Sequence, residues 1–416
     1  MTARRLSARW VLPADGPAVE HGALLIGSDG RIAAVGPEPE VPRPPGVALE
    51  DFGDAVLLPG LINTHTHLEL TGLEGQPPGP DFADWIRRLR EAKATRAPDA
   101  YLDAARRGLA DCLAAGVTTV ADTGDSGAVI QALAEAGGSG IAYQEVFGPH
   151  PDQREASLAG LRQRVEQLGR FVTERVRIGV SPHAPYTVSG PLYAATSEWA
   201  RREGLPVAVH LAESPAESAL LERGVGPFAE AWRGRGIPLP LPPGRTPVAW
   251  LEEHGVLSER TLCIHVVQAG PGDVARLART GASVAHCPLS NRAHGHGAAP
   301  LGALLAAGIR VGLGTDSIVS VGRLDLLAEA RAARVLGGLD AARALALCTL
   351  EGARALGMDG EIGSLAPGKW GDCAVIRPPR GAAGAAPEEQ VLASGPRDVL
   401  ATFVGGRDVH RISRMP

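Results

Sequence analysis

Lysine is almost missing from this 416-residue sequence, which contains only Lys93 and Lys369. The positive charge therefore comes almost entirely from arginine, and the formal net charge is −5. A chain without a broad basic surface has little electrostatic attraction for nucleic acids, so we expect no nucleic-acid partner. Because only two lysines are present, few positions in the chain could supply a lysine side chain to a metal or catalytic site.

Paired cysteines and long apolar runs are missing as well. The five cysteines are widely separated and form no CxxC pair, which favours buried thiols in a reducing compartment. No apolar run approaches the roughly 18 residues that cross a membrane. The apolar run 10–12 is too short for the core of a secretory signal. We therefore expect a cytoplasmic protein with no membrane partner.

Short β segments are predicted at both ends of the sequence. Residues 22–35 contain two apolar runs around an Asp-Gly turn, the pattern of a β-hairpin. The segments 372–376 and 398–407 have a similar pattern near the other end. We therefore expect residues 1–58 and 362–416 to form one composite β-sandwich.

Residues 59–361 repeat a different pattern, in which an Ala-, Leu- and Arg-rich helical stretch ends at a glycine and a short apolar strand follows. Gly116 before residues 117–121 and Gly308 before residues 309–314 are clear cases. A glycine that ends a helix before a buried strand is typical of α/β proteins. About eight such units predict a closed (β/α)₈ TIM-like barrel. The alternative, an open doubly wound sheet, would need a glycine-rich phosphate turn that the sequence lacks.

Histidines and one aspartate fall at the ends of the predicted barrel strands. These strand ends meet at one mouth of a barrel, where active sites form. A single histidine at such a place is more often structural, but a whole ring of them rarely arises by chance. We therefore expect one site formed by His65, His67, His183, His210, His265, His286 and Asp316. We interpret the remaining histidines as structural: His21, His150, His254, His294, His296 and His410.

Part of this ring has the composition of a metal site. His65 and His67 are two positions apart in a predicted strand, so both rings face the same side. With His210 and Asp316 they supply three neutral nitrogens and one carboxylate, which suits one divalent cation. We expect Zn²⁺, and Fe²⁺ is compatible with the same ligands. Such a cation lowers the pKa of a bound water from 15.7 to about 7.

Glu213 follows His210 by three positions. On a continuing strand its side chain would face away from the metal. If the strand ends at the histidine, the following turn can bring the carboxylate back, where it can transfer a proton. The other interpretation is a solvent-exposed glutamate at the start of a helix, and the neighbouring ring of histidines favours the catalytic one.

Six short motifs resemble those of the amidohydrolase superfamily, in the expected order and over nearly the whole chain. They are PGLINTHTH at 59–67, HLAE at 210–213, IHVV at 264–267, AHCPLSN at 285–291, GLGTDS at 312–317 and GSLAPGKWGD at 363–372. The resemblance implies that His65, His67, His210 and Asp316 are the metal ligands. It further implies that Glu213 is the proton shuttle and that His265, together with Asp316, orients the attacking water.

The resemblance also bears on the number of metals. Two-metal members of this superfamily use a carboxylated lysine or a glutamate from the middle strands as a bridge. Lys93 lies in a predicted early helix and Lys369 in the terminal β segment, so no lysine can bridge. Glu145 could reach the mouth, but the HxxE arrangement of His210 and Glu213 resembles the one-metal deaminase branch. We therefore expect one metal.

Within this branch, the motifs DFADWI, SPHAPYTVS and HLAESPAE resemble those of aminodeoxyfutalosine deaminases of the alternative menaquinone pathway. Deaminases of S-adenosylhomocysteine, methylthioadenosine and adenosine are the next resemblance. The implied reaction is hydrolysis of a 6-aminopurine nucleoside with release of ammonia. Candidate substrate contacts are His183, Trp85, Glu145, His286, Ser290 and Asn291. Candidate anchors for a substrate carboxylate are Arg87, Arg88, Arg154 and Arg292.

Several alternatives stay open at this point. The same site could displace chloride from a triazine or hydrolyse a cyclic amide, and a metal-binding barrel without catalysis is a further possibility that the complete ligand set disfavours. Trp85 could stack on a flat substrate ring or pack within its helix. We expect a small-molecule substrate as the partner, and a homodimer is the common assembly of soluble enzymes.

Overall fold

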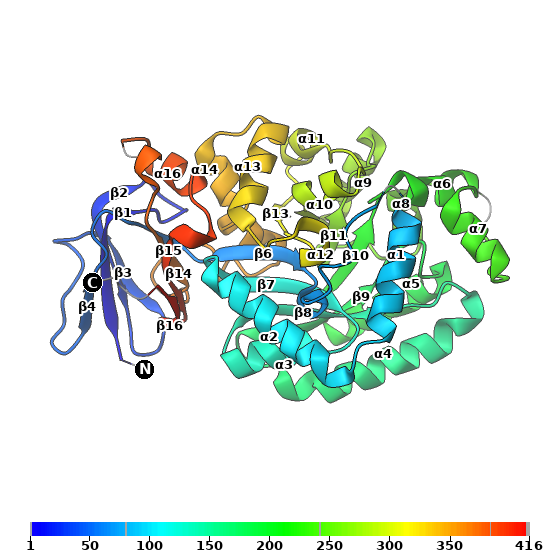
Figure 1. The fold of residues 1–416 in the computed structure, drawn as a ribbon, viewed down its shortest axis with the longest axis horizontal. Coiled ribbons are helices and arrows are strands. Elements are labelled where there is room, and N and C mark those ends of the chain that lie inside the picture. Colours follow the sequence, from blue (N-terminus) through cyan, green and yellow to red (C-terminus); the bar gives the residue numbers. More distant parts are fainter. Residues whose placement is uncertain (1, 80, 241–242, 383, 413–416) are drawn as a thin grey trace.

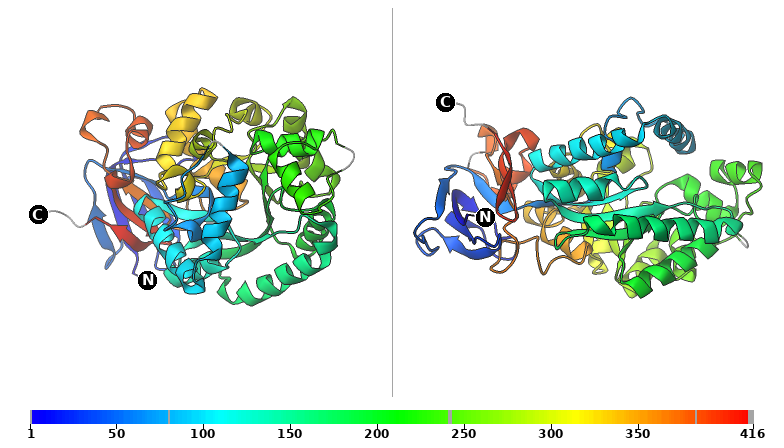
Figure 2. Two further views of the ribbon diagram at one scale, coloured as in Figure 1. Left: turned by 45° about the vertical axis from the view of Figure 1, so that its right-hand side comes forward. Right: turned by 90° about the horizontal axis from the view of Figure 1, so that it is seen from below.

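A computed structural model of the chain describes residues 2–79, 81–240, 243–382 and 384–412. It contains two eight-stranded sheets, one made from both ends of the chain and one from the middle. Figure 1 shows the terminal sheet at one end of the molecule and the helix-covered barrel beside it. The first and last strands lie at the end opposite the helices α6 and α7, and Figure 2 shows the same arrangement from two other sides.

The terminal sheet joins strands from the two ends of the chain. Its strands are β1 (Arg4–Val11), β2 (Val19–Ile26), β3 (Ile32–Pro37), β4 (Ala48–Asp51), β5 (Val56–Pro59), β14 (Cys373–Ile376), β15 (Val399–Val404) and β16 (Arg407–Arg411). The order is β16-β15-β14-β5-β1-β2-β3, and β4 pairs with β1. Strands from both chain ends share one buried core, which includes Leu6 and Leu24 from the first end and Val375 and Phe403 from the other. The Phe52 ring packs against this core, with its centroid 6.4 Å from that of Phe403 in β15. Both predicted hairpins are present in it.

The middle of the chain forms the predicted (β/α)₈ barrel. Its strands are β6 (Leu61–Thr66), β7 (Val117–Gly124), β8 (Ser139–Val146), β9 (Val176–Pro182), β10 (Val207–Leu211), β11 (Thr261–His265), β12 (Ser283–His286) and β13 (Val311–Leu313). They pair in parallel in sequence order. The first and last strands meet where the Asp316 N–H donates to the His65 carbonyl at 3.0 Å. This contact brings two predicted metal ligands together.

Helices surround the barrel and cover its mouth. They are α1 (Phe82–Ala94), α2 (Pro98–Ala114), α3 (Ala128–Ala136), α4 (Arg154–Leu168), α5 (Gly190–Glu203), α6 (Pro215–Arg223), α7 (Pro227–Gly234), α8 (Pro247–Glu253), α9 (Pro271–Thr280), α10 (Pro288–Ala293), α11 (Leu301–Ala306), α12 (Ile318–Val321), α13 (Leu326–Gly337), α14 (Ala341–Ala346), α15 (Leu350–Ala355) and α16 (Pro387–Leu392). Gly204 and Gly281 end α5 and α9 in the left-handed conformation, with φ of 69° and 72°. These are the glycine-terminated helices that the repeat predicted. Within the described ranges, no helix is long and apolar enough to cross a bilayer.

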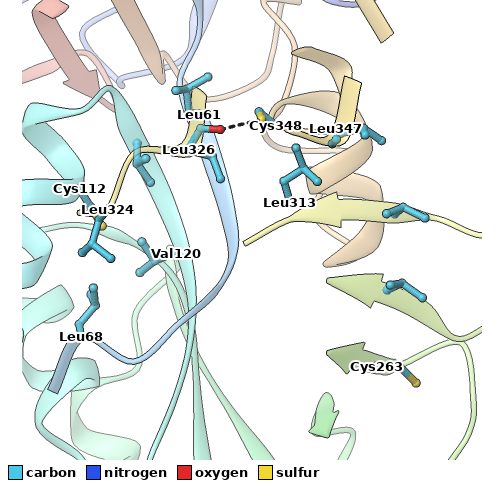
Figure 3. Packing of buried hydrophobic residues seen from close by; sticks show 14 of the residues in the cluster. Leu61, Leu68, Cys112, Val120, Cys263, Leu313, Leu324, Leu326, Leu347 and Cys348 are labelled. Atoms are coloured by element: carbon cyan, nitrogen blue, oxygen red, sulfur yellow. Dashed lines mark hydrogen bonds between the residues drawn. The ribbon is translucent and has the colours of Figure 1, made fainter. Parts of the chain in front are cut away.

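The barrel strands pack against their helices through buried aliphatic side chains. Figure 3 shows Leu61 of β6 and Leu313 of β13 near Leu326 of α13. The Cys348 thiol points to the Leu326 carbonyl at 3.7 Å, and burial raises the pKa of this thiol. All five cysteines are buried as free thiols. Their role is therefore packing, as their spacing predicted.

Candidate metal centre and active site

Four side chains from the predicted ring converge at the barrel mouth. His65 Nε2 and His67 Nε2 each lie 3.5 Å from Asp316 Oδ1. His67 Nε2 also lies 3.2 Å from His210 Nε2. Two ligands that are each about 2.1 Å from a tetrahedral zinc ion are about 3.4 Å apart. Each of these three contacts therefore has the spacing of two ligands that share one cation, and the ligand atoms of His65, His67 and Asp316 all lie within 4.8 Å of one another.

The hydrogen bonds behind the rings explain why a cation fits this place. His67 Nδ1 lies 2.8 Å from the Thr123 carbonyl and His210 Nδ1 lies 3.3 Å from the His183 carbonyl. A ring that donates from Nδ1 keeps a lone pair on Nε2, so two lone pairs face each other. Neither buried nitrogen of His65 has a hydrogen-bond partner among the described residues. A divalent cation would satisfy all three rings.

Backbone turns at the strand ends aim these side chains into the mouth. Ala212, His265 and Asp316 have positive φ angles of 50°, 73° and 59°. Such conformations cost non-glycine residues about 1–3 kcal/mol each and concentrate at functional sites. The turn at Ala212 follows the end of β10 and brings the carboxylate of Glu213 back toward the histidines. Glu213 is only 4% exposed, so it is not a solvent-exposed residue at a helix start.

Glu213 is held beside His265 by a second acid on α6. The carboxylate of Glu217 accepts hydrogen bonds from the backbone N–H groups of Ala212 at 2.8 Å and Glu213 at 2.9 Å. Glu213 Oε1 then lies 3.7 Å from His265 Nε2, and Tyr186 donates its hydroxyl to Glu213 Oε2 at 3.4 Å. The acid and the imidazole thus face the same space above the four ligands.

Residues that follow β12 form hydrogen bonds to His265 and Asp316. His265 donates from Nδ1 to Asn291 Oδ1 at 2.9 Å, which leaves its Nε2 facing Glu213. Ser290 donates to Asp316 Oδ2 at 2.5 Å, and the Ser317 N–H donates to Asp316 Oδ1 at 2.7 Å. Ser290 and Asn291 therefore contact the expected ligand and the expected orienting histidine.

Burial and neighbouring charges give the histidines, Asp316 and Glu213 different protonation states. Burial and the nearby His65 lower the pKa of His67 to about 3, so the ring is neutral and free to bind a cation. Burial alone would raise the pKa of Asp316, but the contact with His65 at 3.5 Å and the other surrounding imidazoles hold it well below its usual value. Burial, reinforced by Asp316, raises the pKa of Glu213 well above its usual value. The site therefore combines an anionic ligand with an acid that readily holds a proton.

A cavity of about 490 Å³ opens above these groups. The predicted residues Trp85, Glu145 and His183 line it, with Glu145 Oε1 lying 3.9 Å from His183 Nε2. The Trp85 indole also donates to the Gln76 carbonyl at 2.9 Å, so it belongs both to the packing of α1 and to the cavity wall. His286, Ser290 and Asn291 are buried outside the lining of this cavity.

Lys93 reaches the cavity, although its place in a predicted early helix suggested only that it could not bridge two metals. Its ammonium lies 3.0 Å from Glu69 Oε1 and 2.7 Å from Asp125 Oδ1, and it lines the wall near Glu145. The helical spacing of Trp85, Leu89 and Lys93 on α1 is the signal that could have found this face.

The arginines at the cavity differ from those that the sequence suggested. Arg87 and Arg88 pair with Asp84 on the surface of α1, Arg154 pairs with Glu155, and Arg292 is exposed away from the lining. The arginines that line the cavity are instead Arg90 and Arg235. Neither has an acidic partner within 4.0 Å in the part of the chain that the structure describes. Burial lowers the pKa of Arg235, and the nearby positive charge of Arg90 lowers it further.

Comparison with known proteins gives consistent matches. The Amidohydrolase family model matches residues 56–409. The chain is 35% identical over 337 residues to an aminodeoxyfutalosine deaminase of Deinococcus radiodurans, with 77% of each chain covered. It is 30% identical over 420 residues to a 5-methylthioadenosine/S-adenosylhomocysteine deaminase of Symbiobacterium thermophilum, covering 96% of this chain and 92% of the relative. The crystal structure of an adenosine deaminase from Xanthomonas campestris with bound zinc superposes with a TM-score of 0.83 at 24% identity, covering 98% of this chain and 92% of that chain.

Proposed function

Because this chain belongs to the amidohydrolase family, we propose that it hydrolyses the 6-amino group of an adenosine-type nucleoside, and that its substrate is aminodeoxyfutalosine. The family and the deaminase relatives make it a hydrolytic deaminase, and the choice of substrate is the finer part of the proposal. The observation that carries the proposal is the buried Glu213 carboxyl. It lies beside His265 and near His65, His67, His210 and Asp316, whose contacts of 3.2 Å and 3.5 Å suit ligands of one cation.

The expected metal is a single zinc ion held by His65, His67, His210 and Asp316. The facing lone pairs and the unpaired nitrogens of His65 support this ligand set. When bound, a divalent cation acts as a Lewis acid and makes a hydroxide nucleophile available near neutral pH.

The side chains around the nucleophile supply the proton transfers. Burial raises the pKa of the Glu213 carboxyl well above its usual value, which favours a group that takes a proton and returns it. Glu213 takes one proton from the attacking water and gives it to the ring nitrogen next to the amine-bearing carbon. His265 Nε2 and Asp316 hold the nucleophile in line with the amine-bearing carbon. The new C–O bond forms first. The remaining hydroxyl proton then passes to the amine nitrogen, the C–N bond breaks with loss of ammonia, and a ring carbonyl remains.

The walls of the cavity suit a flat base with a polar sugar and a distal anion. Phe82, Trp85 and Tyr186 supply aromatic surface. Glu145 and His183 lie side by side without a hydrogen bond between them, with Glu145 Oε1 3.9 Å from His183 Nε2. Glu145 Oε1 has no hydrogen-bond partner among the described residues, so it is available to accept from a substrate hydroxyl group. At the outer end, Arg90 and Arg235 favour a negatively charged group, since a guanidinium binds a carboxylate with two hydrogen bonds.

Ammonia release from a small panel of nucleosides tests this proposal. We expect the highest kcat/KM with aminodeoxyfutalosine, and lower values with adenosine, methylthioadenosine and S-adenosylhomocysteine. A higher value with one of the other three would replace the proposed substrate and keep the reaction. If the zinc-loaded protein released ammonia from none of the four, the proposed reaction would be wrong.

Replacement of Glu213 by Gln tests the proton transfer itself. The amide keeps the shape of the side chain but cannot carry the proton, so we expect kcat to fall by about 10²–10⁴ while the metal stays bound. Glu222→Gln, at a partly exposed site on helix α6, which follows Glu213 in the chain, is the matched control and should leave kcat unchanged. Wild-type kcat in Glu213→Gln would refute the assigned role.

A further inference from the structure

His296 lies against Glu213, although its position in the sequence suggested only a structural role. It follows α10, and it is 5% exposed. Its Nδ1 lies 3.7 Å from Glu213 Oε1, the same oxygen that lies 3.7 Å from His265 Nε2. The carboxylate oxygen therefore has two imidazole nitrogens at the same distance, one from His265 and one from His296.

Both ring nitrogens of His296 are buried without a hydrogen-bond partner among the described residues. An unsatisfied buried polar group costs about 1–3 kcal/mol, so an imidazole with two of them needs an explanation. Contacts within active sites are often long in the free enzyme and shorten when substrate binds. A move of less than 1 Å would bring Nδ1 into hydrogen-bond range of Glu213 Oε1.

The surroundings hold the His296 ring in place. The edge of Phe82 packs on it with 4.5 Å between ring centroids, and His294 stacks on it at 5.2 Å. Gln268 donates to the His296 carbonyl at 2.6 Å and fixes the backbone. With its ring packed in this way, His296 is a rigid neighbour for the carboxyl of Glu213.

We propose that His296 is a positioning residue for Glu213: its Nδ1–H holds Oε1 toward His265, so that the carboxyl stays aligned with the nucleophile. This inference rests on the proposed function of Glu213 as the proton carrier. The hydroxyl of Tyr186 contacts the other oxygen, Oε2, so the two contacts together fix the rotation of the carboxyl. Without His296, Glu213 can turn away from His265.

His294 provides a matched control, because it belongs to the same ring stack but bonds elsewhere. Its Nε2 lies 3.1 Å from the Ser320 hydroxyl, and its ring packs on Trp85 at 4.4 Å. Replacing either histidine by Phe keeps an aromatic ring in the stack. Only His296→Phe removes a donor that faces Glu213.

The test compares four proteins on the nucleoside that the wild type deaminates best. We expect His296→Phe to lower kcat about 10–100-fold with unchanged KM and zinc content, since small misplacements of a catalytic group cost up to about 10². His296→Asn, whose amide can donate from the position of Nδ1, should recover most of this loss. His294→Phe should stay within about twofold of the wild type.

A second measurement keeps the inference separate from the proposed reaction. In crystal structures of the zinc-loaded variants, we expect the carboxyl of Glu213 to rotate away from His265 in His296→Phe and to keep its place in His294→Phe. An unmoved Glu213, or equal losses of kcat in the two Phe variants, would overturn the role of His296. An inactive wild type would instead refute the proposed reaction and leave the crystallographic comparison to decide on His296.

Discussion

The carboxylate of Glu217 accepts two backbone N–H groups in the turn that aims Glu213, and it does so without contact to solvent. Burial raises its pKa to about 7, although the backbone hydrogen bonds favour the charged form. The folded protein therefore binds a proton at Glu217 more tightly than the unfolded chain does. Its contribution to stability is complete below the unfolded pKa, near 4.5, and is lost as the pH rises through about 7.

Replacing Glu217 by Gln should remove this pH dependence. The amide has no proton to lose, but it also offers only one acceptor oxygen to the two N–H groups. We expect the difference in unfolding free energy, wild type minus variant, to fall by up to about 3 kcal/mol between pH 5 and pH 8. Denaturant unfolding of both zinc-loaded proteins at the two pH values measures it. A difference that stays constant with pH would contradict the raised pKa of Glu217.

At the scale of single residues, the sequence predicted site residues that stand at strand ends. It missed residues that reach the site from loops. His65 and His67 could be assigned because the alternation of a strand fixes where each ring points. His296 lies after α10 in an irregular segment, where sequence spacing does not determine direction. Its approach to Glu213 depends on how that segment packs on Phe82 and His294.

At the scale of elements, the contact between β6 and β13 places His65 beside Asp316. Gly314 lies in this contact, and a Cβ on it would be 2.7 Å from the His65 Cβ and 2.8 Å from the His65 nitrogen. No side chain fits there without displacing β6. The glycine thus allows the last strand to approach the first closely enough for the two proposed ligands to face one cation.

Replacement of Gly314 by Ala should therefore weaken metal binding. Overpacking of this kind costs about 1–3 kcal/mol, and displaced ligands commonly lose 10–100-fold in metal affinity. Competition with a zinc chelator measures the affinity of the variant against the wild type. Gly302→Ala in α11 is the control, because a Cβ there meets nothing within 4 Å, and it should be neutral or slightly stabilising. Equal zinc affinities in the two variants would contradict the role of Gly314.

The order of strands and helices followed from the sequence, because glycine-terminated helices and buried strands repeat with a recognisable period. The face of α1 that lines the cavity could not be predicted in this way. Its cavity residues Trp85, Leu89 and Lys93 share a helical spacing, but whether that face covers the mouth depends on the path of the loop before it. For the same reason the sequence suggested Arg87 and Arg88, while the structure turns Arg90 toward the cavity.

At the scale of the whole molecule, a buried ion pair joins the terminal sheet to the barrel. Arg175, just before β9, lies 2.5 Å from Asp372, just before β14, and its guanidinium stacks on Trp370 at 4.6 Å. Asp372 also accepts the Gly405 N–H at 2.6 Å. Sequence patterns predicted that both chain ends enter one β domain, but a contact between residues 175 and 372 is visible only after folding.

Replacement of Asp372 by Asn should destabilise the molecule without changing the chemistry. It leaves a mostly buried guanidinium without its counter-charge, and breaking such a pair costs about 3–5 kcal/mol. We expect a lower midpoint of thermal unfolding and an unchanged kcat for the folded fraction. Glu361→Gln breaks the half-exposed pair with Arg177 and should cost no more than about 1 kcal/mol. Equal midpoints for the two variants would show that the buried pair does not join the two sheets.

The most direct measurement is anomalous diffraction at the zinc edge from crystals of the zinc-loaded protein. Our account predicts one peak per chain, about 2.1 Å from His67 Nε2, His210 Nε2 and Asp316 Oδ1, with His65 as the fourth neighbour. Glu145 and His183 also lie close to His210, within a group whose ligand atoms are 4.8 Å apart or less. A second peak at that group, or no peak among the four proposed ligands, would contradict a single-metal site.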